Sequence, residues 1–368
     1  FSKFKKNNYI FGNTKNKDFL TKNYFNIPLK TLNSKFLSTT NEYCKGFLKI
    51  SESIDFDIIE IHNRPLVIKY LYNKINSKFI LYFHNNPLTM KGSITINERE
   101  NLLKMTDKIV FISKWVKKKF FENLKVSDSD KTSIIYHSIK PQKKISKKKK
   151  FITFVGKLNN AKGYDIFRDA VSKILNSHNN WKAFSIGDET RERPIFDHPR
   201  HYELGFLKHK EVLNFLNKSA IAVVPSRWEE PFGRTSLEAS SRGCATIISN
   251  RGGLPETTDH CVVLKNNNSK NLFRVLKKLI INNTFRKKLQ KESLKNVKHI
   301  IKDNSKLIDE LRFSLINQFK INYNRNKIRI INIYNKGQKS NHRLYNISLG
   351  KKFTNGFIRN GHDVLEIS

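Results

Sequence analysis

The sequence predicts an α/β protein of two Rossmann-like, doubly wound domains that face each other across a cleft. Its 368 residues are enough for two domains of about 150 residues each. From residue 55 onward, short apolar runs alternate with segments of helical periodicity, which is typical of βαβ units and parallel sheets. A basic, proline-led segment at 141–150 divides this alternation into two series.

The first series predicts a domain at residues 1–140. It begins at DIIEIH, a mostly apolar run that suits a buried strand, and helices and strands then alternate. The segment 141–150 is interpreted as a linker, because a run of like charges repels itself and does not pack. The expected elements are a strand at 57–62, a helix at 64–77, a strand at 79–84, a helix at 94–105, a strand at 108–113, a helix at 114–124 and a strand at 133–137.

The second series predicts a domain at 151–283, followed by a charged helical segment at 284–327. In sheets of this kind, ligands bind outside the carboxyl ends of the strands, so we expect function at the strand-to-loop junctions. The expected elements are a strand at 151–155, a helix at 164–177, a strand at 181–187, a helix at 209–217, a strand at 220–224, a helix at 234–242, strands at 245–249 and 261–264, and a helix at 269–281.

The composition is strongly basic. Lysine and arginine total 70 against 31 aspartates and glutamates, and the net charge of +39 favours anionic partners. The basic residues are scattered along the whole chain, however, and no zinc-finger spacing or aromatic RNA-binding signature accompanies them. We therefore interpret the charge as a general property of the surface and do not expect a nucleic-acid partner.

Cysteine usage and hydropathy indicate the compartment. Cys44, Cys244 and Cys261 form no C-x-x-C pair, which argues against a disulfide framework and a zinc site. The sequence shows neither a secretion signal nor 18 consecutive apolar residues, so we expect a cytoplasmic protein.

The basic, aromatic helix at 114–124 could contact an anionic membrane at its inner face. Packing against its own sheet explains the same pattern and is favoured.

The most informative stretch is 225–256, PSRWEEPFGRTSLEASSRGCATIISNRGGLPE. A buried strand is expected to end at Val224, and a loop containing proline and glycine then leads into a helix. The amides of Gly233, Arg234 and Thr235 would lie at the start of that helix, where backbone N–H groups have no intrahelical partner. Such a helix start favours a bound anion.

Two glutamates flank this anion pocket. Glu230 lies on the loop and Glu238 lies within the helix, eight residues further along. Carboxylates accept hydrogen bonds from sugar hydroxyls, so a pair of them beside an anion pocket suits a hydroxyl-rich, anionic ligand.

These residues resemble the carboxyl-proximal signature of the retaining glycosyltransferases of family 4, which have the GT-B fold. The matching motifs are EPFG, LEA, RG and GGLPE, in that order. Two earlier segments resemble the same family: FVGKLNNAKGYDIF within 151–167 and GFLKHKEVLNFL at 205–216. The resemblance covers roughly residues 55–282 of the chain.

The resemblance implies transfer of a hexose from a nucleotide-sugar donor to an acceptor hydroxyl with retention of anomeric configuration. The residues at 1–140 would then bind the acceptor, a glycan or a lipid-linked molecule, and those at 151–283 would bind the donor. We expect a role in the synthesis of cell-surface polysaccharide or lipid glycan. Neither a metal nor another cofactor is implied, and the D-x-D triplets at 55–57 and 128–130 are not interpreted as metal sites.

The same resemblance assigns roles within the signature stretch. Glu230 would contact hydroxyls of the transferred sugar, helped by the amides of Phe232, Gly233 and Arg234. Glu238 would hold the ribose of the nucleotide. The implied donor-binding set is Lys157, Lys162, Phe206, Phe232, Gly233, Arg234, Thr235 and Glu238.

Four positions outside this stretch also carry implied roles. Lys157 and Lys162 would clamp the donor diphosphate, a point-charge role that suits lysine, although the family pattern has arginine at the first of these positions. Phe206 would lie near the nucleobase. His84, in FHNNP at a strand end, matches the active-site histidine of the family and makes up the implied catalytic set with Glu230 and Lys162. His62 also ends a strand and is interpreted as structural.

Two other classes of protein stay open, a polyanion-binding protein on a degenerate transferase scaffold and a phosphorylase on the same fold. A polyanion-binding protein would keep the charge and lose the donor site, so the intact Glu230, Glu238 and Lys162 count against it. A phosphorylase would need a cofactor or free-phosphate site, for which we see no motif.

The carboxyl-terminal segment 328–368 predicts a strand–helix–strand unit, which resembles the opening unit that residues 1–140 lack. Because the chain begins with Phe1, we expect a fragment in which this segment starts a second transferase module. The alternative is a permuted arrangement in which the segment completes the first sheet. In either case an apolar strand needs a sheet. The expected elements are a strand at 328–334, docked beside 58–62, a helix at 344–359 and a strand at 364–367.

Overall fold

The computed structural model divides the chain into two compact units. The first unit takes the described residues up to Ile135 together with those from Lys302 onward, and the second takes Tyr136–Ile301. Each unit contains a six-stranded parallel sheet, which confirms the α/β fold class. The structure describes residues 10–12, 24–27, 39–54, 56–126, 130–190, 194–317, 329–334 and 363–367.

The sheet of the first unit has the strand order β14-β13-β3-β4-β5-β6, with all pairs parallel. Strand β13 pairs with β3, with Ile330 opposite Ile58, so the predicted docking of 328–334 is confirmed. The helix predicted at 344–359 lies outside the described residues. The strands are β3 (Ile58–His62), β4 (Lys78–Phe83), β5 (Lys108–Phe111), β6 (Thr132–Ile134), β13 (Arg329–Tyr334) and β14 (Asp363–Ile367), and β1 (Ile10–Gly12) pairs with β2 (Tyr24–Asn26) in a small separate sheet.

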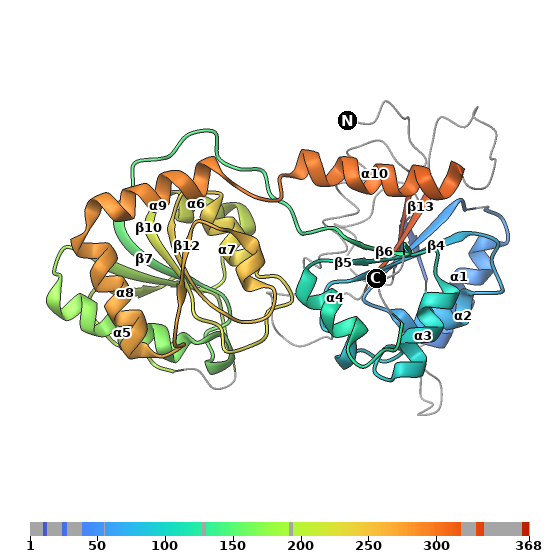
Figure 1. Cartoon of the computed structure of the whole chain (residues 1–368), viewed down its shortest axis with the longest axis horizontal. Coiled ribbons are helices and arrows are strands. Elements are labelled where there is room, and N and C mark those ends of the chain that lie inside the picture. The colour runs from blue at the N-terminus through green and yellow to red at the C-terminus, as the bar shows by residue number, and fades with distance from the viewer. Residues whose placement is uncertain are drawn as a thin grey trace. The chain divides into compact units, whose positions relative to one another are not determined.

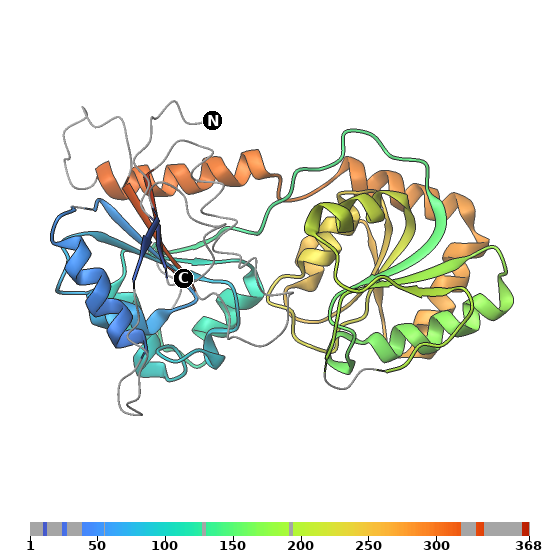
Figure 2. The ribbon, with the colours of Figure 1, turned by 180° about the vertical axis from the view of Figure 1, so that it is seen from behind.

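The helices of the first unit cover both faces of its sheet, with α10 on one face and α2 and α3 on the other (Figures 1 and 2). Helix α2 ends at Leu71, six residues before its predicted end at residue 77, because Tyr72 leaves the helical region with a ψ of -179°; Asn73 follows with a left-handed φ of 29°. Helix α1 was not predicted. The helices are α1 (Thr39–Ser51), α2 (Pro65–Leu71), α3 (Ile96–Met105), α4 (Lys114–Phe121) and α10 (Ile301–Asn317), with a 3₁₀ turn η2 at Pro87–Thr89.

The second unit has the strand order β12-β11-β10-β7-β8-β9, again all parallel. Strand β9 was not predicted, and it is only three residues long. The strands are β7 (Lys149–Val155), β8 (Lys182–Ile186), β9 (His201–Glu203), β10 (Ser219–Val224), β11 (Ala245–Ser249) and β12 (Cys261–Leu264). The helices are α5 (Tyr164–Ser177), α6 (His209–Lys218), α7 (Arg234–Ser240), α8 (Ser269–Ile281) and α9 (Asn283–Lys295), with 3₁₀ turns η3 (Asn160–Lys162) and η4 (Leu254–Thr257).

The basic run at 141–150 packs against the second unit, in contrast to the expected linker. Lys148 Nζ donates to the carbonyl oxygens of Leu216 at 3.2 Å and Arg242 at 2.6 Å, near the ends of two helices. Cations are favoured there because the last helical carbonyls lack partners. Strand β7 begins at Lys149, and the boundary between the units falls after Ile135 instead of near residue 140.

The segment expected at 284–327 also divides between the units. Helix α9 belongs to the second unit, while most of α10 belongs to the first. Helix α10 packs Ile308, Leu311 and Leu315 onto Ile58, Ile80 and other apolar side chains of the first sheet. This contact explains why a helix so far along the sequence completes the first unit.

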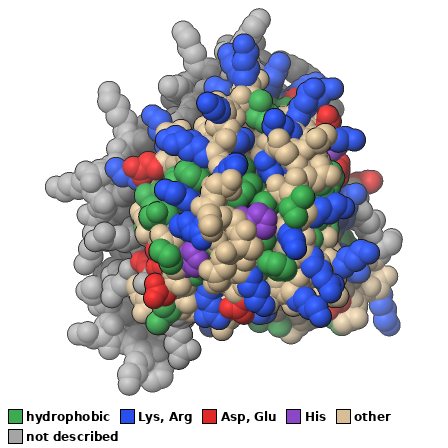
Figure 3. All heavy atoms as spheres, turned by 90° about the vertical axis from the view of Figure 1, so that its left-hand side faces the viewer, with side chains coloured by type: hydrophobic (Ala, Val, Ile, Leu, Met, Phe, Trp, Pro, Cys, Tyr) green, Lys and Arg blue, Asp and Glu red, His purple; other side chains and the backbone are tan. Residues whose placement is uncertain are grey.

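Basic side chains are spread over the surface shown in Figure 3. On that face, lysines and arginines lie among apolar and acidic side chains and do not form one stripe. Across the residues that the structure describes, no helix is both long and apolar enough to cross a membrane.

Candidate functional site

The loop between β10 and α7 begins and ends as the sequence predicts. Strand β10 ends at Val224 and α7 begins at Arg234. Gly233 caps the helix with a left-handed φ of 103°, and a Cβ at this position would collide with the Leu254 side chain. Only glycine adopts this conformation without strain. The loop therefore reaches the helix start through a conformation that depends on Gly233.

Lys162 and Glu230 are brought together by two loops of the second unit. Lys162 Nζ lies 2.6 Å from Glu230 Oε1, with the side chains 32% and 12% exposed. The loops approach closely at Gly163, whose φ is 72° and where a Cβ would collide with the carbonyl oxygen of Pro225. The Ala161 carbonyl also accepts hydrogen bonds from the amides of residues 227 and 228, both at 2.9 Å. The structure thus joins the two motifs that resemble a donor site.

Glu238 is held in place by two basic side chains. It is 7% exposed, and its Oε1 accepts from Arg234 at 3.1 Å and lies 2.9 Å from His209 Nε2. His209 is the first residue of α6, which packs against α7. His209 lies in the segment GFLKHKEVLNFL, which resembles the family, but no role was expected for it. One sequence feature could have pointed to His209: it lies at the start of a helix, directly after the loop expected near the nucleobase.

The GGLPE motif lies against the backbone of Glu230. The Gly253 amide donates to the Glu230 carbonyl oxygen at 2.6 Å. This bond fixes the peptide that carries the Glu230 side chain. The last motif of the signature stretch therefore supports the loop that precedes α7.

The side chain of Phe232 is buried, being only 1% exposed. Its ring packs 5.7 Å from Tyr136, 5.5 Å from His137 and 5.5 Å from His299, measured between ring centroids. Burial, with a contribution from Glu256, raises the pKa of Tyr136 to about 12, so its hydroxyl stays protonated at neutral pH. Because the ring of Phe232 is buried, only its backbone amide suits the predicted contact with the transferred sugar. The ring anchors the loop.

The remaining predicted donor residues lie on loops and at the start of α7. Phe206 is 39% exposed and follows Gly205, which has a φ of 60°. Lys157 is half-buried in the loop after β7, and its carbonyl oxygen accepts from the Asn159 amide at 2.9 Å. Thr235 is the second residue of α7. These positions agree with the expected strand-to-loop junctions.

His84 belongs to the first unit and follows β4 directly. Its ring is 3% exposed, and its Nε2 lies 2.7 Å from Nδ1 of His62. Burial lowers the pKa of His84 from 6.5 to about 3, so the ring is neutral at physiological pH. The structure thus gives His84 partners within its own unit.

The buried, neutral His84 predicts that the protein is less stable in acid. The unfolded chain takes up a proton at this residue near pH 6.5, whereas the folded chain does so only near pH 3. The free energy of unfolding should therefore fall by about 1.4 kcal/mol per pH unit from this group as the pH drops below 6.5. Urea unfolding at pH 7 and pH 5 measures how much unfolding free energy is lost between these two pH values. This loss should be smaller in His84→Gln than in the wild type. An equal difference in both would contradict the assignment.

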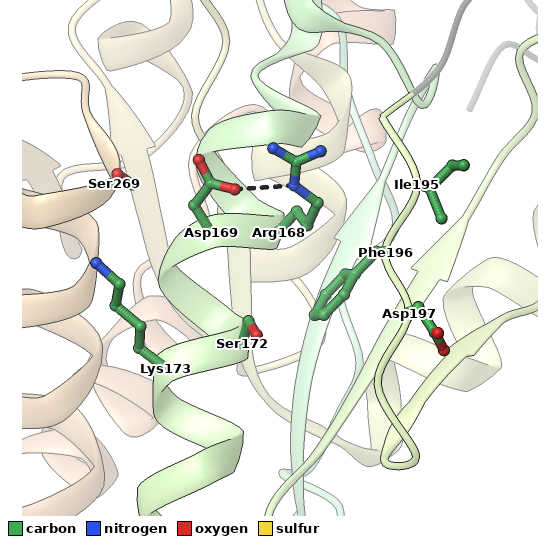
Figure 4. Close-up of a pocket in the computed structure, with 8 residues that line it drawn as sticks. All are labelled: Arg168, Asp169, Ser172, Lys173, Ile195, Phe196, Asp197 and Ser269. Atoms are coloured by element: carbon green, nitrogen blue, oxygen red, sulfur yellow. Dashed lines mark hydrogen bonds and ion pairs between the residues drawn. The ribbon is translucent and has the colours of Figure 1, made fainter.

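A pocket of 360 Å³ lies beside α5, and it is lined by none of the predicted site residues (Figure 4). Arg168 and Asp169 form an ion pair at 2.8 Å on its wall, and Phe196 closes one side. Within the described ranges, no group of three or more His, Cys, Asp or Glu side chains could hold a metal ion. Asp55 and Asp128, which begin the two D-x-D triplets, lie outside the described residues.

Comparison with known proteins gives consistent matches. The family described as "Glycosyl transferases group 1" matches residues 136–296. The uncharacterized glycosyltransferase MJ1178 of Methanocaldococcus jannaschii is 30% identical over 261 residues, 65% of this chain and 70% of that protein. YtcC of Bacillus subtilis, which carries a provisional glycosyltransferase name, is 28% identical over 241 residues, 56% of this chain and 58% of its own length. The chain thus spans less than two thirds of YtcC.

A solved structure shares the fold. Anabaena Alr3699/HepE, in complex with UDP and glucose, superposes with a TM-score of 0.59 at 13% identity, covering 78% of this chain and 85% of that one. At this identity the match supports the GT-B type of fold and carries no argument about individual residues.

Proposed function

Because the chain belongs to the group 1 glycosyltransferases, we propose that it transfers a hexose from a nucleotide-sugar to an acceptor hydroxyl with retention of configuration. Retention rests on the resemblance to family 4. The structure of HepE with UDP and glucose supports a nucleotide-sugar as the donor. We further propose a cytoplasmic protein that acts on a glycan or lipid-linked acceptor in the synthesis of cell-surface polysaccharide or lipid glycan. Contact with an anionic membrane is not part of this proposal, because Val116 and Phe120 of α4 are buried and the Phe120 ring packs on Phe111 of β5.

The contact between Lys162 and Glu230, at 2.6 Å, carries this proposal. A cation suited to the donor diphosphate and a carboxylate suited to the sugar hydroxyls lie side by side. A nucleotide-sugar presents these two chemistries on adjacent groups. The departing nucleoside diphosphate develops negative charge, which Lys162 would stabilise, together with Lys157 and the amides at the start of α7.

The two glutamates do not suit glycoside hydrolysis. A hydrolase places two carboxyl groups on either side of the scissile bond, one as acid and one as base or nucleophile. Here Glu230 pairs with Lys162, and Glu238 is nearly buried beside Arg234 and His209. Each carboxylate thus contacts basic side chains of its own unit, which suits binding of hydroxyl groups better than proton transfer.

Glu238→Ala should raise the donor KM about tenfold or more while changing kcat little. The ribose contact acts about equally in the ground and transition states, and a hydrogen bond to a charged group is worth about 1.5–3 kcal/mol. Steady-state kinetics with varied donor concentration checks this. Glu292→Ala is the control, because Glu292 lies in α9 and its carboxylate accepts from the Asn296 side chain at 3.0 Å, and it should leave both constants unchanged. A fall in kcat at constant KM would contradict the ribose assignment.

The proposed function is tested by release of nucleoside diphosphate from a panel of nucleotide-sugars, with and without candidate acceptors. We expect turnover of at least one donor by the wild type and its loss in Glu230→Gln. Glu229→Gln provides a matched control, because the neighbouring Glu229 is 46% exposed and pairs with Arg251. If no donor is bound or turned over, the transferase proposal fails and the polyanion-binding alternative gains.

A chelator should leave the turnover unchanged. The proposed stabilisation of the leaving diphosphate uses Lys157, Lys162 and backbone amides, and it assigns no step to a divalent ion. Turnover measured with and without an excess of EDTA checks this prediction. Activity that is lost in EDTA and restored by magnesium or manganese would reopen the D-x-D triplets as candidate metal sites.

A further inference from the structure

A continuous series of side chains, buried except for the half-buried Asp309 at its start, leads from α10 to His84 within the first unit. Its members come from three elements and from the residue that follows β4, and each contacts the next. At the sequence level only His84 has an expected catalytic role, and His62 has a structural one. The series is Asp309, Arg312, Glu60, Tyr82, His62 and His84.

The first part of the series is a fully buried ion pair. Arg312 donates from Nε and from Nη2 to the two carboxylate oxygens of Glu60, both at 2.9 Å, and neither side chain is exposed. Tyr82 donates its hydroxyl to Glu60 Oε1 at 2.9 Å. Asp309 adds a second carboxylate to Arg312, at 3.2 Å. A buried charge with this many partners is held in one geometry.

The second part of the series connects the buried ion pair, through Tyr82, to the two histidines. The rings of Tyr82 and His62 are stacked, with centroids 4.3 Å apart and planes 9° apart. His62 Nδ1 lies 2.7 Å from His84 Nε2, and the two rings are also nearly parallel, at 13°. The His84 amide donates to Asn63 Oδ1 at 2.7 Å, which fixes the backbone that carries the ring. The plane of His84 is therefore set from two sides.

The contact between the histidines couples their proton positions. A neutral imidazole has one N–H donor and one acceptor nitrogen, so one ring must donate across this contact and the other must accept. If Nε2 of His84 accepts, its proton is on Nδ1. If Nε2 donates, Nδ1 is the acceptor. The tautomer of His62 thus determines which hydrogen-bonding group His84 offers at Nδ1.

We propose that His62 is a positioning residue that selects the tautomer and ring plane of His84, and that Arg312, through Glu60 and Tyr82, holds His62 in place. This proposal rests on the proposed function, in which His84 contacts the donor sugar near the reacting carbon. It assigns to α10, which follows the donor-binding residues in the chain, a part in ordering the catalytic histidine of the first unit.

Two variants of His62 separate the hydrogen bond from the packing. His62→Phe keeps a ring to stack on Tyr82 and removes the nitrogen, while His62→Asn removes the ring and keeps a polar atom near the position of Nδ1. We expect His62→Phe to lower kcat about 10- to 100-fold, the loss typical of residues that orient an active group, with the donor KM within about twofold. The kcat of His62→Asn should fall clearly less than the kcat of His62→Phe. Equal losses in both, or wild-type kinetics in His62→Phe, would overturn the proposal.

A spectroscopic measurement tests the same pair without enzyme activity. In protein labelled with ¹⁵N-histidine, we expect a scalar coupling across the hydrogen bond between His62 and His84 and a single neutral tautomer of His84. Both signatures should disappear in His62→Phe. A wild-type protein without this coupling, or with a mixture of His84 tautomers, would overturn the proposal. If no nucleotide-sugar is turned over, the proposed function fails, and this measurement still decides whether His62 orders His84.

Discussion

Lys162→Ala should lower kcat by roughly 30- to 1000-fold, corresponding to about 2–4 kcal/mol in the activation barrier. Lys162 Nζ lies 2.6 Å from Glu230 Oε1, at the place where the diphosphate and the transferred sugar would meet. Negative charge on the diphosphate grows as the glycosidic bond breaks, so a cation at this place stabilises the transition state more than the ground state. The donor KM should therefore change much less than kcat.

Steady-state kinetics of the variant, with the donor as the varied substrate, checks this prediction. Lys173→Ala is a suitable control, because Lys173 is an exposed lysine of α5 in the pocket that lies apart from the donor residues. Its kinetics should match those of the wild type. Wild-type kcat in Lys162→Ala would remove this lysine from the mechanism.

Arg312→Met should destabilise the first unit by about 3–5 kcal/mol. The substitution leaves the Glu60 carboxylate buried with Tyr82 and without the cation that pairs with both of its oxygens. Removing one partner of a buried ion pair costs this much because the remaining charge has lost both water and its counter-ion. Hydrogen exchange of peptides from β3 and β4, measured by mass spectrometry, reports the free energy of opening of this sheet.

Two further variants make this result specific. Lys306→Met removes a cation from the same helix, where Lys306 is 79% exposed and lies 3.5 Å from Glu310, and it should cost less than about 1 kcal/mol. Glu60→Gln combined with Arg312→Met removes both charges and should recover part of the loss. If Arg312→Met and Lys306→Met had the same small effect, the buried pair would contribute nothing to the stability of the sheet.

The sheets were predictable because their strands are short apolar runs separated by amphipathic helices. The residues 57–62, 79–84 and 245–249 fold as strands within one or two residues of expectation. Three-residue β9 was missed because so short a segment carries no periodicity. The end of α2 was placed too late, because the helix ends where Tyr72 takes an extended ψ of -179°, and the apolar pattern gives no sign of this.

The partners of the site residues were less predictable than the residues themselves. Lys162 and Glu230 were each identified from a local motif, but their contact depends on the pairing of β7 with β10. Glu60 is a lone carboxylate in an apolar strand, which indicates a buried cation. The sequence could not show that this cation is Arg312, 252 residues further along the chain.

The anomeric configuration of the first-formed product tests the central claim most directly. With a nucleotide-sugar that the protein turns over, labelled with ¹³C at the anomeric carbon, NMR recorded early in the reaction distinguishes the two anomers. A retaining transferase converts an α-linked donor to an α-linked product, and we expect the product to appear at the rate of nucleoside diphosphate release. A β-linked product, or diphosphate release without any sugar transferred, would contradict the account.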